Sequence, residues 1–74
     1  MSTYNDGKIR AAIQYQGRSI GYRVIVQYPA FGGIVTCKDP GATVYPQGKG
    51  LPTYLQAFDW MTEKINNIKS MLAD

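Results

Sequence analysis

Hydrophobic and polar residues alternate in two segments of the chain, residues 8–15 and residues 20–28. The apolar positions that share one face are Ile9, Ala11, Ile13, Tyr15, Ile20, Tyr22, Val24, Val26 and Tyr28. A period of two residues predicts half-buried strands, because successive side chains of a strand point to opposite faces of a sheet. The linker Gln16-Gly17-Arg18-Ser19 suits a two-residue type II′ turn. We therefore predict a hairpin over residues 8–28 in which Tyr15 pairs with Ile20.

Turn-forming residues divide the middle of the chain. Pro29 ends the second strand, Gly32-Gly33 permits a bend, and residues 33–38 are typical of a third strand. Residues 42–45 fit either a short fourth strand or an extended loop. Residues 1–7 are polar, which predicts a flexible N-terminal tail.

The last third of the chain predicts one helix over residues 53–73. Thr53 and Gln56 have the spacing of a capping box, and no Gly or Pro follows Pro52. A period of 3.6 residues places six apolar side chains in one sector, namely Tyr54, Phe58, Met61, Ile65, Ile68 and Leu72. The expected fold is of the α+β class: a small antiparallel sheet of three to four strands (β-β-β-(β)-α), with the long C-terminal helix packed on one face and residues 8–74 in a single domain.

The amino-acid composition argues against several kinds of catalytic and metal-binding site. The chain has 74 residues, with 45% hydrophobic and 18% charged, which is typical of a folded domain. It has no His and a single Cys, so zinc, haem and triad sites lack their usual ligands and bases. We therefore expect no enzyme, no catalytic residue, no metal and no cofactor. Cys37 has no partner for an intrachain disulfide, which favours a reducing, cytoplasmic location. No aliphatic run exceeds three residues, so we expect no membrane span.

The positive charge is concentrated in the predicted sheet. Residues 1–50 carry six Lys and Arg against two Asp, a balance of +4, and residues 51–74 have a balance of −1. The alternation places several basic side chains on the face away from the helix, with Ala12 and Ile25 among them. This pattern fits a platform for an anionic partner, or an ordinary solvated face protected by charge. The predicted partner- or nucleic-acid-binding residues are Lys8, Arg10, Arg18, Arg23, Ile25, Gln27, Lys38 and Lys49.

The helix offers a second candidate interface. Trp60, Lys64 and Met71 share one flank beside the apolar sector, where Trp60 either packs against a loop or anchors a partner. Most of the six Tyr point to the predicted core, which argues against base stacking on the outer face. The segment Gly48-Lys49-Gly50 fits a loop before the helix, or a weak phosphate-binding turn.

Two segments resemble known small families. The segment Gly50-Leu51-Pro52-Thr53-Tyr54-Leu55-Gln56-Ala57 resembles the helix start in the arm-type DNA-binding domain of tyrosine recombinases, whose three-stranded sheet enters the major groove. Together with Asp39-Pro40-Gly41, it also resembles the HicB-like antitoxin module, although the spacing is longer here. A small chain of sheet plus helix is similar in style to phage and mobile-element accessory proteins, including anti-CRISPR inhibitors.

These observations predict a small non-enzymatic protein that docks on a macromolecular partner and occludes it, as phage accessory inhibitors do. A protein or nucleoprotein complex is the first expected partner. The alternative is a DNA- or RNA-binding module that uses the basic outer sheet face. The chain is expected to be a monomer or a homodimer.

Overall fold

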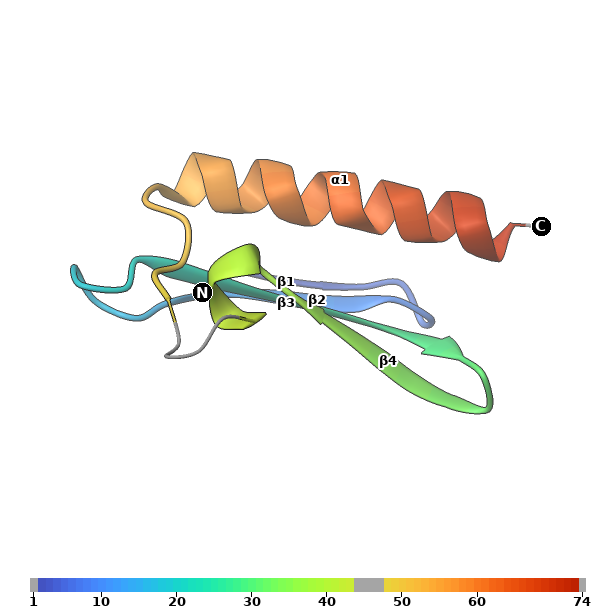
Figure 1. The fold of residues 1–74 in the computed structure, drawn as a ribbon. Helices are drawn as coiled ribbons and strands as arrows, with labels where there is room; N and C mark the ends of the chain where they lie inside the picture. The colour runs from blue at the N-terminus through green and yellow to red at the C-terminus, as the bar shows by residue number, and fades with distance from the viewer. Residues whose placement is uncertain (1, 44–47, 74) are drawn as a thin grey trace.

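Four antiparallel strands and one long helix form the computed structural model of the protein (Figure 1). The structure describes residues 2–43 and 48–73. The elements are β1 (Ser2–Asn5), β2 (Arg10–Tyr15), β3 (Tyr22–Ala30), β4 (Gly33–Lys38), the 3-10 helix η1 (Pro40–Thr43) and the helix α1 (Tyr54–Leu72). The strands lie in the order β1-β2-β3-β4, so the sheet is a simple meander. The predicted α+β class, with a small antiparallel sheet and a C-terminal helix, is confirmed.

The β2–β3 hairpin has the predicted faces but not the predicted register. Tyr15 pairs with Tyr22 and not with Ile20, so the register differs by two residues. The connection is not a two-residue turn but a longer loop, closed by a 2.8 Å hydrogen bond from the Gln16 N–H to the Gly21 carbonyl. Because strands have a period of two, this shift leaves each side chain on its predicted face.

The N-terminal residues form a strand, so the flexible tail predicted for residues 1–7 is wrong. Strand β1 pairs with β2 from Ser2–Ile13 to Asn5–Arg10. The turn that follows is held by Asp6, whose Oδ1 accepts hydrogen bonds from the backbone N–H of Lys8 (3.0 Å) and Ile9 (2.8 Å). A short polar strand has no apolar alternation of its own, and the open edge of β2 supplies its backbone partners.

The segment after β4 turns into a 3-10 helix. The Ala42 N–H donates to the Asp39 carbonyl at 2.9 Å, and residues 40–43 form η1. Residues 42 and 43 therefore belong to no strand, whereas the rest of the fourth strand predicted over residues 42–45 lies outside the described residues.

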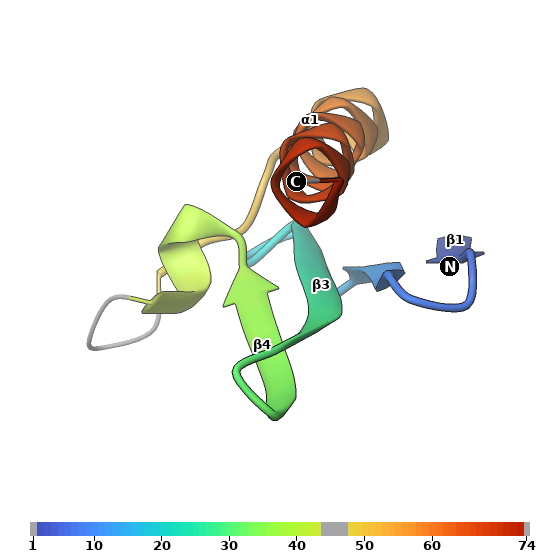
Figure 2. The same cartoon turned by 90° about the vertical axis from the view of Figure 1, so that its right-hand side faces the viewer.

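Helix α1 begins where the capping pattern predicts. Thr53 is the N-cap, and its Oγ1 accepts a 3.1 Å hydrogen bond from the Gln56 N–H. The helix lies over β3 and β2 and leaves β1 to one side (Figure 2). Its buried residues are Ala57, Met61, Ile65 and Ile68. Tyr54 and Phe58, predicted in the core, are 42% and 43% exposed, because the helix presents the small Ala57 to the sheet instead.

The core lies between α1 and one face of the sheet. The buried strand residues that face α1 are Ile9, Ala11, Ile13, Val24 and Val26. Within the described residues, no helix covers the opposite face of the sheet (Figures 1 and 2), and the predicted binding residues Arg10, Ile25, Gln27 and Lys38 lie there.

Truncation of Ile13 tests the core assignment. Ile13 is 1% exposed, so Ile13→Ala should lower the free energy of unfolding by about 2–5 kcal/mol through lost burial and a residual cavity. The matched control is Ile34→Ala, whose side chain is 71% exposed and which should change stability by no more than about 0.5 kcal/mol. Urea denaturation of both variants is the measurement. Equal effects would contradict the assignment.

Candidate interaction surface

Two rows of side chains cross all four strands on the face away from α1. The first row is Asn5–Arg10–Gln27–Thr36, and the second is Thr3–Ala12–Ile25–Lys38. We call these eight residues the outer face. The predicted residues Arg10, Ile25, Gln27 and Lys38 all belong to it.

The outer face combines positive charge with a small apolar centre. Arg10 and Lys38 are exposed, and strand spacing places their Cα atoms roughly 12 Å apart. Ala12 and Ile25 are half-buried neighbours between them. None of the eight residues is acidic. The outer face is therefore complementary to a surface that carries negative charge around an apolar contact.

Arg23 does not belong to the accessible surface, which corrects the prediction that it binds a partner. Its side chain is 8% exposed, and its Nη1 forms a 2.9 Å ion pair with Oδ2 of Asp39, which is fully buried. The Nη2 of Arg23 donates to the Gly48 carbonyl at 2.7 Å. Oδ1 of Asp39 accepts from the Val24 N–H at 2.9 Å. The ion pair joins β3 to the segments that follow β4 and precede α1, so its role is structural.

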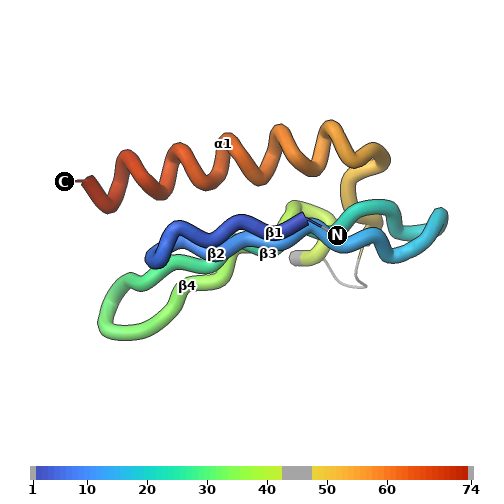
Figure 3. The backbone as a smooth tube through the Cα atoms, turned by 180° about the vertical axis from the view of Figure 1, so that it is seen from behind, coloured from blue at the N-terminus to red at the C-terminus, as the bar shows by residue number. Residues whose placement is uncertain are grey.

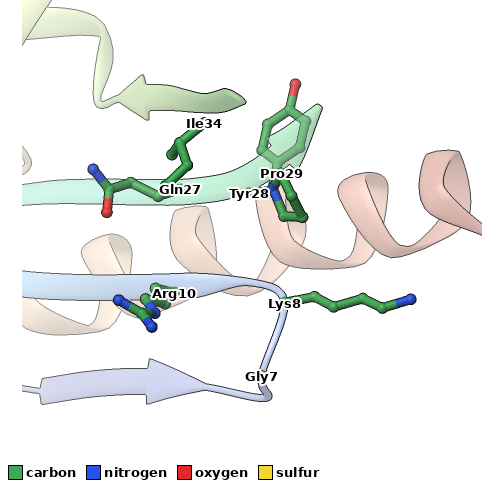
Figure 4. Close-up of a pocket in the computed structure, with 7 residues that line it drawn as sticks. All are labelled: Gly7, Lys8, Arg10, Gln27, Tyr28, Pro29 and Ile34. Atoms are coloured by element: carbon green, nitrogen blue, oxygen red, sulfur yellow. The ribbon is translucent and has the colours of Figure 1, made fainter. Parts of the chain in front are cut away.

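A depression of about 210 Å³ lies at the end of the outer face near the β1–β2 turn (Figure 4). The residues that line it are Gly7, Lys8, Arg10, Gln27, Tyr28, Pro29 and Ile34. A second depression of about 240 Å³ shares Arg10 and Gln27 with it and continues over Ala12 and Ile25. The structure thus brings the predicted residue Lys8 together with Arg10 and Gln27, on a surface continuous with Ile25.

Arg18 and Lys49 lie apart from this group. They line a depression of about 300 Å³ at the β2–β3 turn, at the other end of β2. The Gly48 N–H donates to the Gly41 carbonyl, and the Gly50 N–H donates to the Ile20 carbonyl. These two N–H groups already have partners within the chain, so they are not available to bind a phosphate as the alternative prediction for this segment requires.

The helix flank is partly explained by packing. Trp60 is half-buried and packs against the core cluster, and the Nζ of Lys64 lies 5.2 Å from the centre of its ring. Met71 is 51% exposed. A cation over an indole is a favourable contact within the chain itself, so Trp60 is a less accessible anchor than the sequence suggests.

Sequence reasoning missed three residues of the outer face: Thr3 and Asn5 of β1, and Thr36 of β4. Thr3 and Asn5 enter it only because β1 pairs with β2, which polar residues do not signal. Thr36 pairs with Gln27, and its Oγ1 accepts a 3.3 Å hydrogen bond from the Gln27 Nε2. The alternation in residues 33–38 was the available signal for Thr36.

Two further classes of site have no support in the described residues. No group of three or more His, Cys, Asp or Glu side chains comes together within residues 2–43 and 48–73. In the same part of the chain, no helix has the length and hydrophobicity needed to span a membrane.

Removal of Asp39 tests the structural role of the ion pair. Asp39→Ala leaves a buried guanidinium without its carboxylate, so the free energy of unfolding should fall by about 3–5 kcal/mol. Asp39→Asn retains an oxygen acceptor, so its free energy of unfolding should fall by less than that of Asp39→Ala. The control Asp59→Ala removes an exposed carboxylate on α1. Urea denaturation measures all three. If Asp39→Ala is no less stable than the control, the ion pair does not hold the fold.

Asp6 provides a test at low pH. Hydrogen bonds from the backbone N–H groups of Ile9 and Lys8 hold the pKa of Asp6 below its ordinary value of 3.8. The folded state thus binds this proton less readily than the unfolded chain, so Asp6 stabilises the fold at neutral pH and the contribution is lost as the pH falls below about 4.

The Asp6→Asn variant should therefore lose less stability than the wild type between pH 5 and acid, by urea denaturation at each pH. Asp59→Asn, which removes an exposed carboxylate from α1, is the control for the loss of one negative charge. If the free energy of unfolding of Asp6→Asn falls as much as that of the wild type below pH 5, Asp6 does not have this role.

Comparisons with known proteins leave function to be inferred from this geometry. No protein-family model, no curated protein and no solved structure matches the chain.

Proposed function

We propose that the protein is a non-enzymatic binding module that docks on a macromolecular partner through the outer face and occludes the surface it covers. The observation that carries the proposal is the juxtaposition of Arg10 and Lys38 around Ala12 and Ile25, with no acidic residue in either row. Lys8 extends this charge past the end of β2.

The charge pattern supports an anionic partner. Arg23 and Asp39 neutralise each other inside the protein, so their removal from the count leaves the +4 balance of residues 1–50 unchanged. Like charges on one face speed the approach of an oppositely charged partner and exclude basic ones.

The apolar centre favours a protein over a nucleic acid. Interfaces between proteins combine an apolar core with a polar rim, and Ala12 and Ile25 are rimmed by Arg10, Gln27 and Lys38. We propose that the protein covers an acidic surface on a protein or nucleoprotein complex, as phage accessory inhibitors do. A cytoplasmic site of action is consistent with the lone Cys37, which packs against the core.

Binding of duplex nucleic acid is the second candidate. The row Asn5–Arg10–Gln27–Thr36 offers amide, guanidinium and hydroxyl donors, which are the groups that read base edges. Neither row contains an aromatic residue, so stacking on single strands has less support. Three phosphate contacts, from Lys8, Arg10 and Lys38, would give a log–log salt slope of about −2.7.

Charge reversal tests the proposed face. Arg10→Glu/Lys38→Glu should weaken partner capture from a lysate of the source cells by about tenfold or more, because it replaces attraction with repulsion across the interface. The matched control is Lys64→Glu/Lys69→Glu, which changes the net charge equally but lies on α1. Circular dichroism establishes that both variants are folded.

Nuclease treatment of the lysate separates the two candidates. Capture that survives the nuclease and is lost in Arg10→Glu/Lys38→Glu supports the protein-docking proposal. Loss of capture on nuclease treatment, with a measurable salt slope on a labelled duplex, supports the second candidate instead. If only the α1 variant loses capture, the outer face is not the binding surface.

A further inference from the structure

The β3–β4 hairpin ends in a two-residue turn that projects away from α1 (Figures 1 and 3). Ala30 pairs with Gly33, which leaves Phe31 and Gly32 as the central residues. Both have positive φ, 54° for Phe31 and 75° for Gly32. This combination is the type I′ turn, whose central positions favour Asn and Gly. The turn is short and paired up to its last residue, so it presents the side chain of Phe31 in a defined direction.

Phe31 is an unfavourable choice for this position in two respects. A bulky residue rarely adopts positive φ, because its Cβ crowds the backbone. Its side chain is also 100% exposed, so the ring gains no burial in compensation. Backbone strain that the fold does not need is a feature of binding sites.

The surroundings of the tip are apolar with positive charge on one side. Ile34 pairs with Pro29 and is 71% exposed. Ile34 and Pro29 share a depression with Lys8 and Arg10 (Figure 4). The next residues of β4, up to Thr36, are uncharged. The tip thus joins an apolar projection to the basic end of the outer face.

We propose that Phe31 is an anchor that inserts into an apolar pocket on the protein partner, beside acidic residues that contact Lys8 and Arg10. The inference rests on the proposed function and names the feature that its partner must have. Aromatic anchors that fill a pocket carry a large share of the affinity of protein interfaces. The paired turn fixes the backbone at Phe31 before binding, which lowers the conformational entropy lost on binding.

The alternative occupants fit the tip less well. A groove of about 490 Å³ is lined by apolar residues that include Phe58 and Met61, but its charged lining residue is Lys69, which would repel Lys8 and Arg10 of a second copy. Proteins that insert an apolar wedge into duplex DNA also contact the groove with Arg, Lys, Asn or Gln. On the β4 side of the tip, residues 33–37 include none of these residue types. One ring is also a weak membrane anchor.

Substitution of Phe31 separates this role from a structural one. Phe31→Asn suits the type I′ turn, so its Tm should rise by about 4–8 °C. Its capture of the nuclease-resistant partner should weaken by about 30-fold or more. Phe31→Leu keeps an apolar side chain and the strain, so it should retain part of the capture without the gain in Tm. Leu55→Asn, which removes an exposed apolar side chain from α1, is the control and should capture normally.

A photo-crosslinker at the tip identifies the occupant. p-Benzoylphenylalanine incorporated at position 31 should crosslink to one protein segment that combines apolar and acidic residues, as mapped by mass spectrometry. A crosslink to DNA, lipid or a second copy of the chain would overturn the proposal. A fall in the Tm of Phe31→Asn would also overturn it, because the ring would then stabilise the fold.

The outcomes distinguish the anchor from the docking face. If Arg10→Glu/Lys38→Glu loses capture while Phe31→Asn retains it, the anchor is wrong and the proposed function stands. If Phe31→Asn loses capture while Arg10→Glu/Lys38→Glu retains it, Phe31 contacts the partner, but the outer face and the acidic neighbours proposed for Arg10 are wrong. If both variants capture normally, both proposals fail.

Discussion

The buried ion pair between Arg23 and Asp39 joins β3 to the segment that follows β4 and to the segment that precedes α1. Arg23 lies in β3, Asp39 follows β4, and the Gly48 carbonyl that accepts from Arg23 precedes the helix. A buried charge is costly unless it is paired, so these segments must come together for any of them to be stable. The pair also removes one charge of each sign from the surface. The charge available to a partner on the sheet therefore comes from Arg10 and Lys38, with Lys8 beside them.

One face of the sheet stabilises the fold, and the other is the face that we propose for recognition. One face gives its apolar side chains to α1 and closes the core. The other is left open and carries cations around a small apolar centre. The β3–β4 hairpin extends this open side with a two-residue turn and an exposed ring at Phe31. A docking face with one anchor at its edge accounts for both the charge pattern and the strained residue.

Periodicity was sufficient to predict the faces of β2 and β3, because a register shift of two residues leaves each side chain on the same side. It could not predict the register, since the length of the Gln16–Gly21 loop is set by backbone contacts. Strand β1 was missed because its polar residues carry no pattern. Arg23 was misassigned because alternation places it on the outer face, whereas its partner is 16 residues away and meets it only in the folded chain.

We propose that a partner docks on the outer face. The most direct measurement is residue-resolved amide NMR of the labelled protein during titration with the captured, nuclease-treated partner. We expect the largest signal changes along Arg10–Ala12, Ile25–Gln27 and the β3–β4 turn, with α1 little affected. Changes concentrated on α1 around Trp60 and Met71, with the outer face silent, would contradict it.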